Sequence, residues 1–255
     1  MRRSYFLVEG PHDVEVVGRI LRRGGLKRIR LEEELDDFWE RLVPRKFPHA
    51  GDLLRRVPVP SFFADQERSV AVQSAGGFEK IPSHMTATLA NLDGELEGVG
   101  VLVDADDTAV RPRWEKLANE LPLPDVGAGP GEIGDGPPVA GVYVLPDNES
   151  SGALEHLLLA CAEKAYPTLL AGARAWIDGI DPDDRDIFID ANERKWIKKP
   201  SGKPKAIAAC IASVLRPGRA LQVSIQDNRW LHDDGALDLE IVRRFRQFVE
   251  RIAGL

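Results

Sequence analysis

Four short apolar runs, each followed by a stretch with helical spacing, fill the first two thirds of the sequence. The runs lie at residues 5–8, 69–77, 98–107 and 139–148, and the third is apolar almost without interruption up to Asp104. That character is typical of a parallel strand that is covered on both faces. Strands that alternate with helices in this way predict an α/β fold with a mainly parallel sheet flanked by helices.

The expected helices follow from apolar periodicity and from their start and stop signals. Pro11 suits the first turn of a helix that ends at Gly24. Three more helices are expected after the other runs, at residues 82–92, about 112–121 and 151–165. The last third of the chain also has helical spacing of its apolar residues, which predicts a helical C-terminal part.

The alternation also indicates how the chain is divided. Residues 1–215 are expected to form the α/β domain, and residues 216–255 a helical extension packed on it. Residues 31–68 do not fit the alternation, so an insertion or lid is expected there.

No apolar run approaches the roughly 20 residues that cross a bilayer. The two cysteines lie far apart in apolar contexts, which indicates reduced, buried thiols and not a disulfide. We expect a cytoplasmic protein with no membrane partner, and the oligomeric state stays open.

Carboxylates follow three of the four apolar runs. Glu9 comes after the first run, Asp104 and Asp106 end the third, and Asp147 and Glu149 follow the fourth. Because the carboxyl ends of parallel strands lie along one edge of a sheet, these side chains are expected to meet in one pocket. Like charges at that density require a bound cation, a lysine or arginine, or full exposure to water.

Two further carboxylates can reach the same place from helices. Asp13 lies one turn into the first expected helix, and Glu155 lies a similar distance into the helix after the fourth run. Carboxylate oxygens without histidine or cysteine select hard cations such as Mg²⁺ or Mn²⁺. For Asp147 and Glu149 a second interpretation stays open, because both positions also suit a local turn or cap.

The order of these motifs resembles the Toprim domain. The stretch VEGPHD at residues 8–13 matches its glutamate–glycine pair after the first strand, and VDADD at residues 103–107 matches its later Asp-x-Asp. Toprim domains are Rossmann-like metal-binding modules of topoisomerases, bacterial primases and OLD-family nucleases. The resemblance covers about residues 5–214. The sequence resembles most strongly the small stand-alone Toprim-like proteins that are related to the OLD nucleases.

The resemblance implies roles for individual carboxylates. Glu9 matches the Toprim glutamate, which is an acid/base group or a metal ligand. Asp104 and Asp106 match the metal-binding pair. Asp13 and Glu155 match the acidic ligands that OLD-type members add on their helices.

The resemblance also implies a lysine and a protein partner. Lys205 matches the phosphate-facing lysine of OLD-type members, although Lys203 could fill that role instead. OLD proteins join this module to an ATPase domain, and this sequence has no phosphate-loop motif, so a separate ATPase or other protein partner is expected.

Residues 194–219 contain eight basic residues and no acidic one, although the whole chain has a net charge of −7. A phosphate-rich partner could use such a stripe. The residues expected to contact the backbone of DNA or RNA are Arg194, Lys195, Lys198, Lys199 and Lys203.

Together these residues predict a metal-dependent phosphodiesterase, a nuclease that acts on DNA or RNA. Two Mg²⁺ or Mn²⁺ ions about 3.5–4 Å apart would clamp the scissile phosphate. Lys205 would neutralise the charge that develops on it.

Two alternative functions stay open. The first is a non-catalytic Toprim module that binds a metal or a nucleotide. The second is a phosphatase of the haloacid dehalogenase type, because residues 104–108 also fit Asp-x-Asp-x-Thr with Asp104 as the nucleophile.

Overall fold

A six-stranded sheet forms the centre of the fold. The computed structural model describes residues 1–47, 51–53, 58–232 and 235–255. The strand order is β2-β3-β4-β1-β5-β6. Four strands run parallel: β4 (Arg68–Ser74), β1 (Arg2–Val8), β5 (Gly98–Asp104) and β6 (Val139–Leu145). Two short strands extend the edge in antiparallel fashion: β3 (Ser61–Ala64) beside β4, and β2 (Lys27–Arg28) beside β3. The expected α/β class with a mainly parallel sheet is confirmed.

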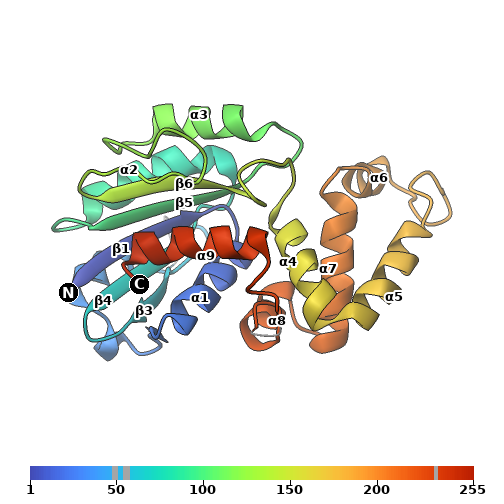
Figure 1. The fold of residues 1–255 in the computed structure, drawn as a ribbon, viewed down its shortest axis with the longest axis horizontal. Coiled ribbons are helices and arrows are strands. Elements are labelled where there is room, and N and C mark those ends of the chain that lie inside the picture. Colours follow the sequence, from blue (N-terminus) through green and yellow to red (C-terminus); the bar gives the residue numbers. More distant parts are fainter. Residues whose placement is uncertain (48–50, 54–57, 233–234) are drawn as a thin grey trace.

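Helices cover both faces of the sheet (Figure 1). One face carries α1 (Pro11–Arg23) and α9 (Glu240–Ala253), and the other carries α2 (Ile81–Asn91) and α3 (Val110–Glu120). Successive side chains of a strand point to opposite faces. In β1, Phe6 and Val8 therefore join the core under α1 and α9, whereas Tyr5 and Leu7 join the core under α2 and α3. Every strand and helix expected between residues 5 and 165 is present to within three residues.

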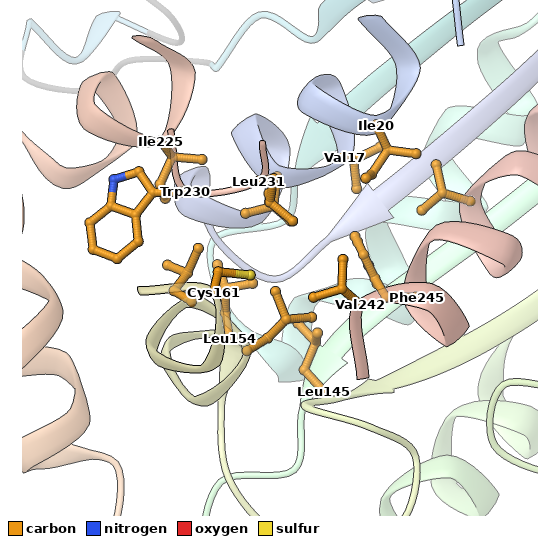
Figure 2. Close-up of a cluster of buried hydrophobic side chains, with 14 of the residues drawn as sticks. Val17, Ile20, Leu145, Leu154, Cys161, Ile225, Trp230, Leu231, Val242 and Phe245 are labelled. Atoms are coloured by element: carbon orange, nitrogen blue, oxygen red, sulfur yellow. The ribbon is translucent and has the colours of Figure 1, made fainter. Parts of the chain in front are cut away.

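Five helices form a lobe beside the sheet. They are α4 (Leu154–Ala165), α5 (Pro167–Asp178), α6 (Ala191–Ile197), α7 (Gly202–Leu215) and α8 (Leu221–Asp227). Figure 1 shows α5, α6 and α7 to one side of the molecule, with α4 and α8 between them and the sheet. Figure 2 shows the apolar cluster that joins the two parts, where Leu154 and Cys161 of α4 lie near Val17 of α1 and Val242 of α9.

The C-terminal helix belongs to the α/β part of the molecule. Phe245 of α9 packs edge-on against Tyr143 of β6, with ring centroids 5.4 Å apart. The expected extension of residues 216–255 does pack on the domain, but α9 covers the sheet itself. The helices that stand apart are α5, α6 and α7, which lie within the range expected for the domain.

The described part of residues 31–68 contains short elements that lie against the sheet. The segment contains two 3₁₀ helices, η1 (Glu32–Glu34) and η2 (Asp37–Leu42), followed later by β3. Trp39 is fully buried, and its Nε1 donates to Ser69 Oγ over 2.7 Å. The first half of the segment therefore packs on the sheet, and its end adds a strand. Residues 48–50 and 54–57 of the expected insertion lie outside the described residues.

Two simpler expectations concern the cysteines and the membrane. Cys161 and Cys210 are free thiols, as expected. Among the helices of the described residues, none combines the length and the apolar character that a membrane span needs.

Gly98 allows α9 to approach the sheet closely. A Cβ atom at Gly98 would lie 2.1 Å from the carbonyl oxygen of Ile252, which also accepts a hydrogen bond from Ser4 Oγ over 3.0 Å. We expect Gly98→Ala to lower the free energy of unfolding by about 1–3 kcal/mol, because backbone atoms must move. Urea unfolding measures this loss. Gly136→Ala is the control, since a Cβ there meets nothing within 4 Å. Equal losses in both variants would contradict the close approach.

Candidate metal centre

The candidate site lies where the direction of chain travel across the sheet reverses. From β1 the chain passes through α1 to β4 on one side, and from β5 it passes through α3 to β6 on the other. The helices α1 and α3 cover opposite faces. Neighbouring parallel strands with this arrangement leave a crevice outside their carboxyl ends. Glu9 and Asp104 stand at the ends of β1 and β5, on either side of that crevice.

A pocket of about 540 Å³ occupies the crevice, and we call it the acidic pocket. Glu9 follows β1, Asp13 lies in the first turn of α1, Asp104 ends β5, and Glu155 lies in the first turn of α4. Lys205, in the first turn of α7, lines the same pocket. Four carboxylates and one ammonium group from five segments of the chain therefore meet at one place.

Backbone N–H groups orient three of the four carboxylates. Asp104 N donates to Glu9 Oε2 over 3.2 Å, Gly10 N donates to Asp13 Oδ2 over 2.7 Å, and Leu154 N donates to Asp104 Oδ1 over 2.9 Å. Such bonds hold a carboxylate in one orientation and strengthen when it is ionised. Each bond uses one oxygen and leaves the second oxygen of the carboxylate for another partner.

Glu155 has a buried oxygen without a partner. Its side chain is buried, and within the described structure its Oε2 has no hydrogen-bond partner. Its other oxygen, Oε1, lies 3.8 Å from His12 Nδ1. Leaving a carboxylate oxygen buried and unpaired is costly. A cation in the acidic pocket would remove that cost.

Burial and mutual repulsion disfavour the ionised carboxylates. Burial, together with the nearby Glu9 and Glu155, raises the pKa of Asp13 to about 7. The pKa of Asp104 is raised well above its usual range by burial, and next by Asp13, Glu9 and Glu155. Burial also raises the pKa of Glu9, against the opposing hydrogen bond from the Asp104 amide. Each shift has the direction expected of a cluster in which the carboxylates outnumber the nearby cations.

Lys205 is the lysine that faces this cluster. Burial alone would lower its pKa, but the attraction of Glu155 and then of Asp104 outweighs burial and raises it. Lys203 points elsewhere, and its ammonium group pairs with Asp178 over 3.1 Å. The structure thus brings Lys205, and not Lys203, into the acidic pocket.

Arg113 of α3 is a site residue that the sequence did not reveal. Its Nε donates to the carbonyl oxygen of Asp104 over 2.9 Å, and its Nη2 lies 3.2 Å from Asp106 Oδ2 and 3.9 Å from Glu9 Oε2. Its guanidinium also lies over the ring of Phe78, 3.8 Å from the centroid. Arg113 therefore ties the ends of β1 and β5 together. Asp106 turns towards it and stays outside the lining of the acidic pocket.

Asp147 and Glu149 lie in a different place from the one expected. Asp147 accepts hydrogen bonds from Glu149 N over 3.0 Å and from Ser150 N over 2.7 Å, which is the local turn role. Glu149 pairs with Arg244 over 2.5 Å. Both acidic residues line a separate pocket with Tyr143. They lie away from the acidic pocket because β6 is the outermost strand, one position beyond the crevice.

The basic residues expected to contact nucleic acid lie on the lobe, and two of them form ion pairs with acidic residues. Lys198 pairs with Asp183, in the same way that Lys203 pairs with Asp178. Lys199 lies over the ring of Trp196, 4.4 Å from the centroid. Arg194 and Lys195 belong to α6. Residues 178–205 contain as many acidic as basic side chains, so this surface is less basic than the sequence stripe suggested.

The acidic pocket has the donors for a divalent cation. Over the described ranges, no three histidine, cysteine, aspartate or glutamate side chains already stand around one point as ligands do. Rotation about side-chain bonds can bring the carboxylate oxygens of the pocket closer together. The donors are all oxygens, which suits Mg²⁺ or Mn²⁺. The residues that fit this role are Glu9, Asp13, Asp104 and Glu155.

Comparisons with known proteins place the chain in a family. No curated protein matches it. The crystal structure of a hypothetical protein from Pyrococcus horikoshii OT3 is similar over 99% of this chain and 95% of that chain, with 18% identity and a TM-score of 0.49. Residues 3–252 match the model of a family described as "Protein of unknown function (DUF3226)". Because that match spans nearly the whole sequence, the chain belongs to this family.

Proposed function

We propose that the protein is a metal-dependent phosphodiesterase of the Toprim/OLD type that cleaves DNA or RNA. The observation that carries the proposal is the convergence of four carboxylates and Lys205 on the acidic pocket. That pocket lies at the reversal point of a mainly parallel sheet, where α/β folds bind their ligands. The orphaned Oε2 of Glu155 and the raised pKa values of Asp13 and Asp104 support cation binding there.

The residues of the acidic pocket would divide the work between them. Glu9, Asp13, Asp104 and Glu155 would hold Mg²⁺ or Mn²⁺, with two ions expected. Bound ions of this kind polarise a phosphate and lower the pKa of a bound water. Lys205 would bind a non-bridging phosphate oxygen and stabilise the negative charge that grows there during the reaction. Arg113 would keep the ends of β1 and β5 at a fixed separation.

The lobe gives the nucleic acid a surface to approach. Trp196 is 63% exposed and carries Lys199 over its ring. An exposed aromatic ring with a neighbouring cation can stack on a base and contact the adjoining phosphate. Because Lys198 and Lys203 are paired with aspartates, we expect Trp196, Lys199, Arg194 and Lys195 to contribute most of the contact.

Cleavage of supercoiled plasmid and of a labelled RNA, with Mg²⁺ or Mn²⁺, tests the proposal. We expect cleavage by the wild type and a loss of at least about 100-fold in Glu155→Gln and in Lys205→Met. Glu149→Gln is the matched control, because it makes the same chemical change at an exposed ion pair outside the pocket. Its rate should stay within about twofold of the wild type.

Two results would count against the proposal. Cleavage that survives Glu155→Gln would show that the reaction occurs elsewhere or is a contaminant. Intact substrates in every reaction, together with Mn²⁺ binding that Glu155→Gln removes, would indicate a metal-binding module without catalysis.

A further inference from the structure

A second pocket lies on the opposite side of β4 from α1, between α2 and the end of η2. We call it the basic pocket, and its volume is about 510 Å³. Small-molecule sites usually have volumes of about 300–1,000 Å³. Its polar lining consists of Arg41, Arg45, Lys46, Gln73, His84, Thr88 and Asn91. None of these residues belongs to the acidic pocket.

The charge of the basic pocket is opposite to that of the whole chain. Three cationic side chains line it, and among the described residues no carboxylate does, although the chain has a net charge of −7. Arg41 pairs with Asp93 and Arg45 pairs with Glu32, both as exposed ion pairs whose acidic partners are not part of the lining. Exposed pairs of this kind contribute about 0–1 kcal/mol each, so a phosphate group could replace the carboxylates.

The wall and floor offer neutral donors and acceptors. His84, Thr88 and Asn91 follow each other at helical spacing along α2, and all three line the pocket. His84 Nδ1 is buried and has no hydrogen-bond partner within the described structure. On the floor, Gln73 Oε1 accepts from Tyr5 OH over 2.8 Å, which fixes the amide and leaves its NH₂ group for a ligand. Carboxamides such as those of Gln73 and Asn91 can recognise the edges of bases.

We propose that the basic pocket binds a nucleoside phosphate. The phosphate would lie against Arg41, Arg45 and Lys46 at the rim. The nucleoside would lie inside, against Gln73, His84 and Asn91. This binding goes beyond the proposed nuclease activity and needs no metal. A free nucleotide and the 5′-phosphorylated end of a strand carry the same chemistry, so the test includes both.

Isothermal titration calorimetry of the full chain tests the proposal. The probes are ATP, AMP, a 5′-phosphorylated oligonucleotide and inorganic phosphate, all in EDTA, so that no divalent ion can hold a phosphate at the acidic pocket. Ala87→Glu adds a carboxylate to the lining at an exposed helical position. We expect it to weaken nucleotide binding by at least about tenfold through like-charge repulsion.

Thr86→Glu is the matched control, because it adds the same charge at the preceding residue of α2, which is also exposed but lies outside the lining. Its affinity should stay within about twofold of the wild type. Glu155→Gln should also bind normally, which separates this result from the fate of the proposed nuclease. Three results would overturn the proposal: no binding of any nucleoside phosphate, equal affinity for inorganic phosphate and AMP, or equal losses in Ala87→Glu and Thr86→Glu.

Discussion

Replacing Asp104 by asparagine will remove Mn²⁺ binding, whereas the same change at Asp106 will leave most of it. Asp104 lines the acidic pocket and accepts from Leu154 N through Oδ1. An asparagine can keep that hydrogen bond, so the fold should survive while one anionic ligand is lost. We expect the dissociation constant for Mn²⁺, measured by calorimetry, to rise by at least about 100-fold.

Asp106→Asn is the matched control, because it makes the same chemical change outside the acidic pocket. Asp106 has a φ of 50°, in the left-handed region that asparagine adopts readily. Its carboxylate is held by Arg113 and lies outside the lining of the acidic pocket. We expect Asp106→Asn to weaken Mn²⁺ binding by no more than about fivefold, which corresponds to about 1 kcal/mol. Equal losses in the two variants would restore Asp106 as a ligand. Phosphatase activity lost in both would favour the dehalogenase-type alternative.

The central part of the fold is readable from the sequence because each central strand is a compact apolar run. The strands β1, β4, β5 and β6 are buried on both faces, so their composition alone distinguishes them. The edge strands β2 and β3 depend instead on pairing with a neighbour. β2 has two residues, both basic, and β3 follows a proline-rich stretch. No local pattern marks either of them.

The same contrast holds for the acidic pocket. Glu9, Asp13, Asp104 and Glu155 could be grouped from the sequence because strand ends and helix starts place them at one edge of a parallel sheet. Asp147 and Glu149 have the same local signature, but the sequence does not state that β6 is outermost. Arg113 lies on a helix that contains two other arginine or lysine residues, and only the packing of α3 brings it to the strand ends.

The metal-free protein will lose stability as the pH rises from about 4 to about 7. Burial raises the pKa of Asp13 from 3.8 to about 7, and burial also raises the pKa values of Asp104 and Glu9. The folded protein therefore holds these protons more tightly than the unfolded chain. The resulting stabilisation is fully present below the unfolded pKa values, near 4, and is lost as the pH rises through the raised values. Urea unfolding in EDTA across this range measures the loss.

Asp13→Asn isolates the cause of this pH dependence. Asparagine can still accept from Gly10 N, but it carries no charge at high pH. We expect the variant to be more stable than the wild type at pH 8 by on the order of 2 kcal/mol, with a flatter pH profile. Asp107→Asn, at an exposed position of the same acidic stretch, should leave the profile unchanged. At pH 8, Mn²⁺ should stabilise the wild type but not Asp13→Asn, because an ion that binds only the folded state stabilises it by mass action. Wild-type stability that rises towards pH 8 in EDTA would mean that the carboxylates are already balanced, and the acidic pocket would then need no cation.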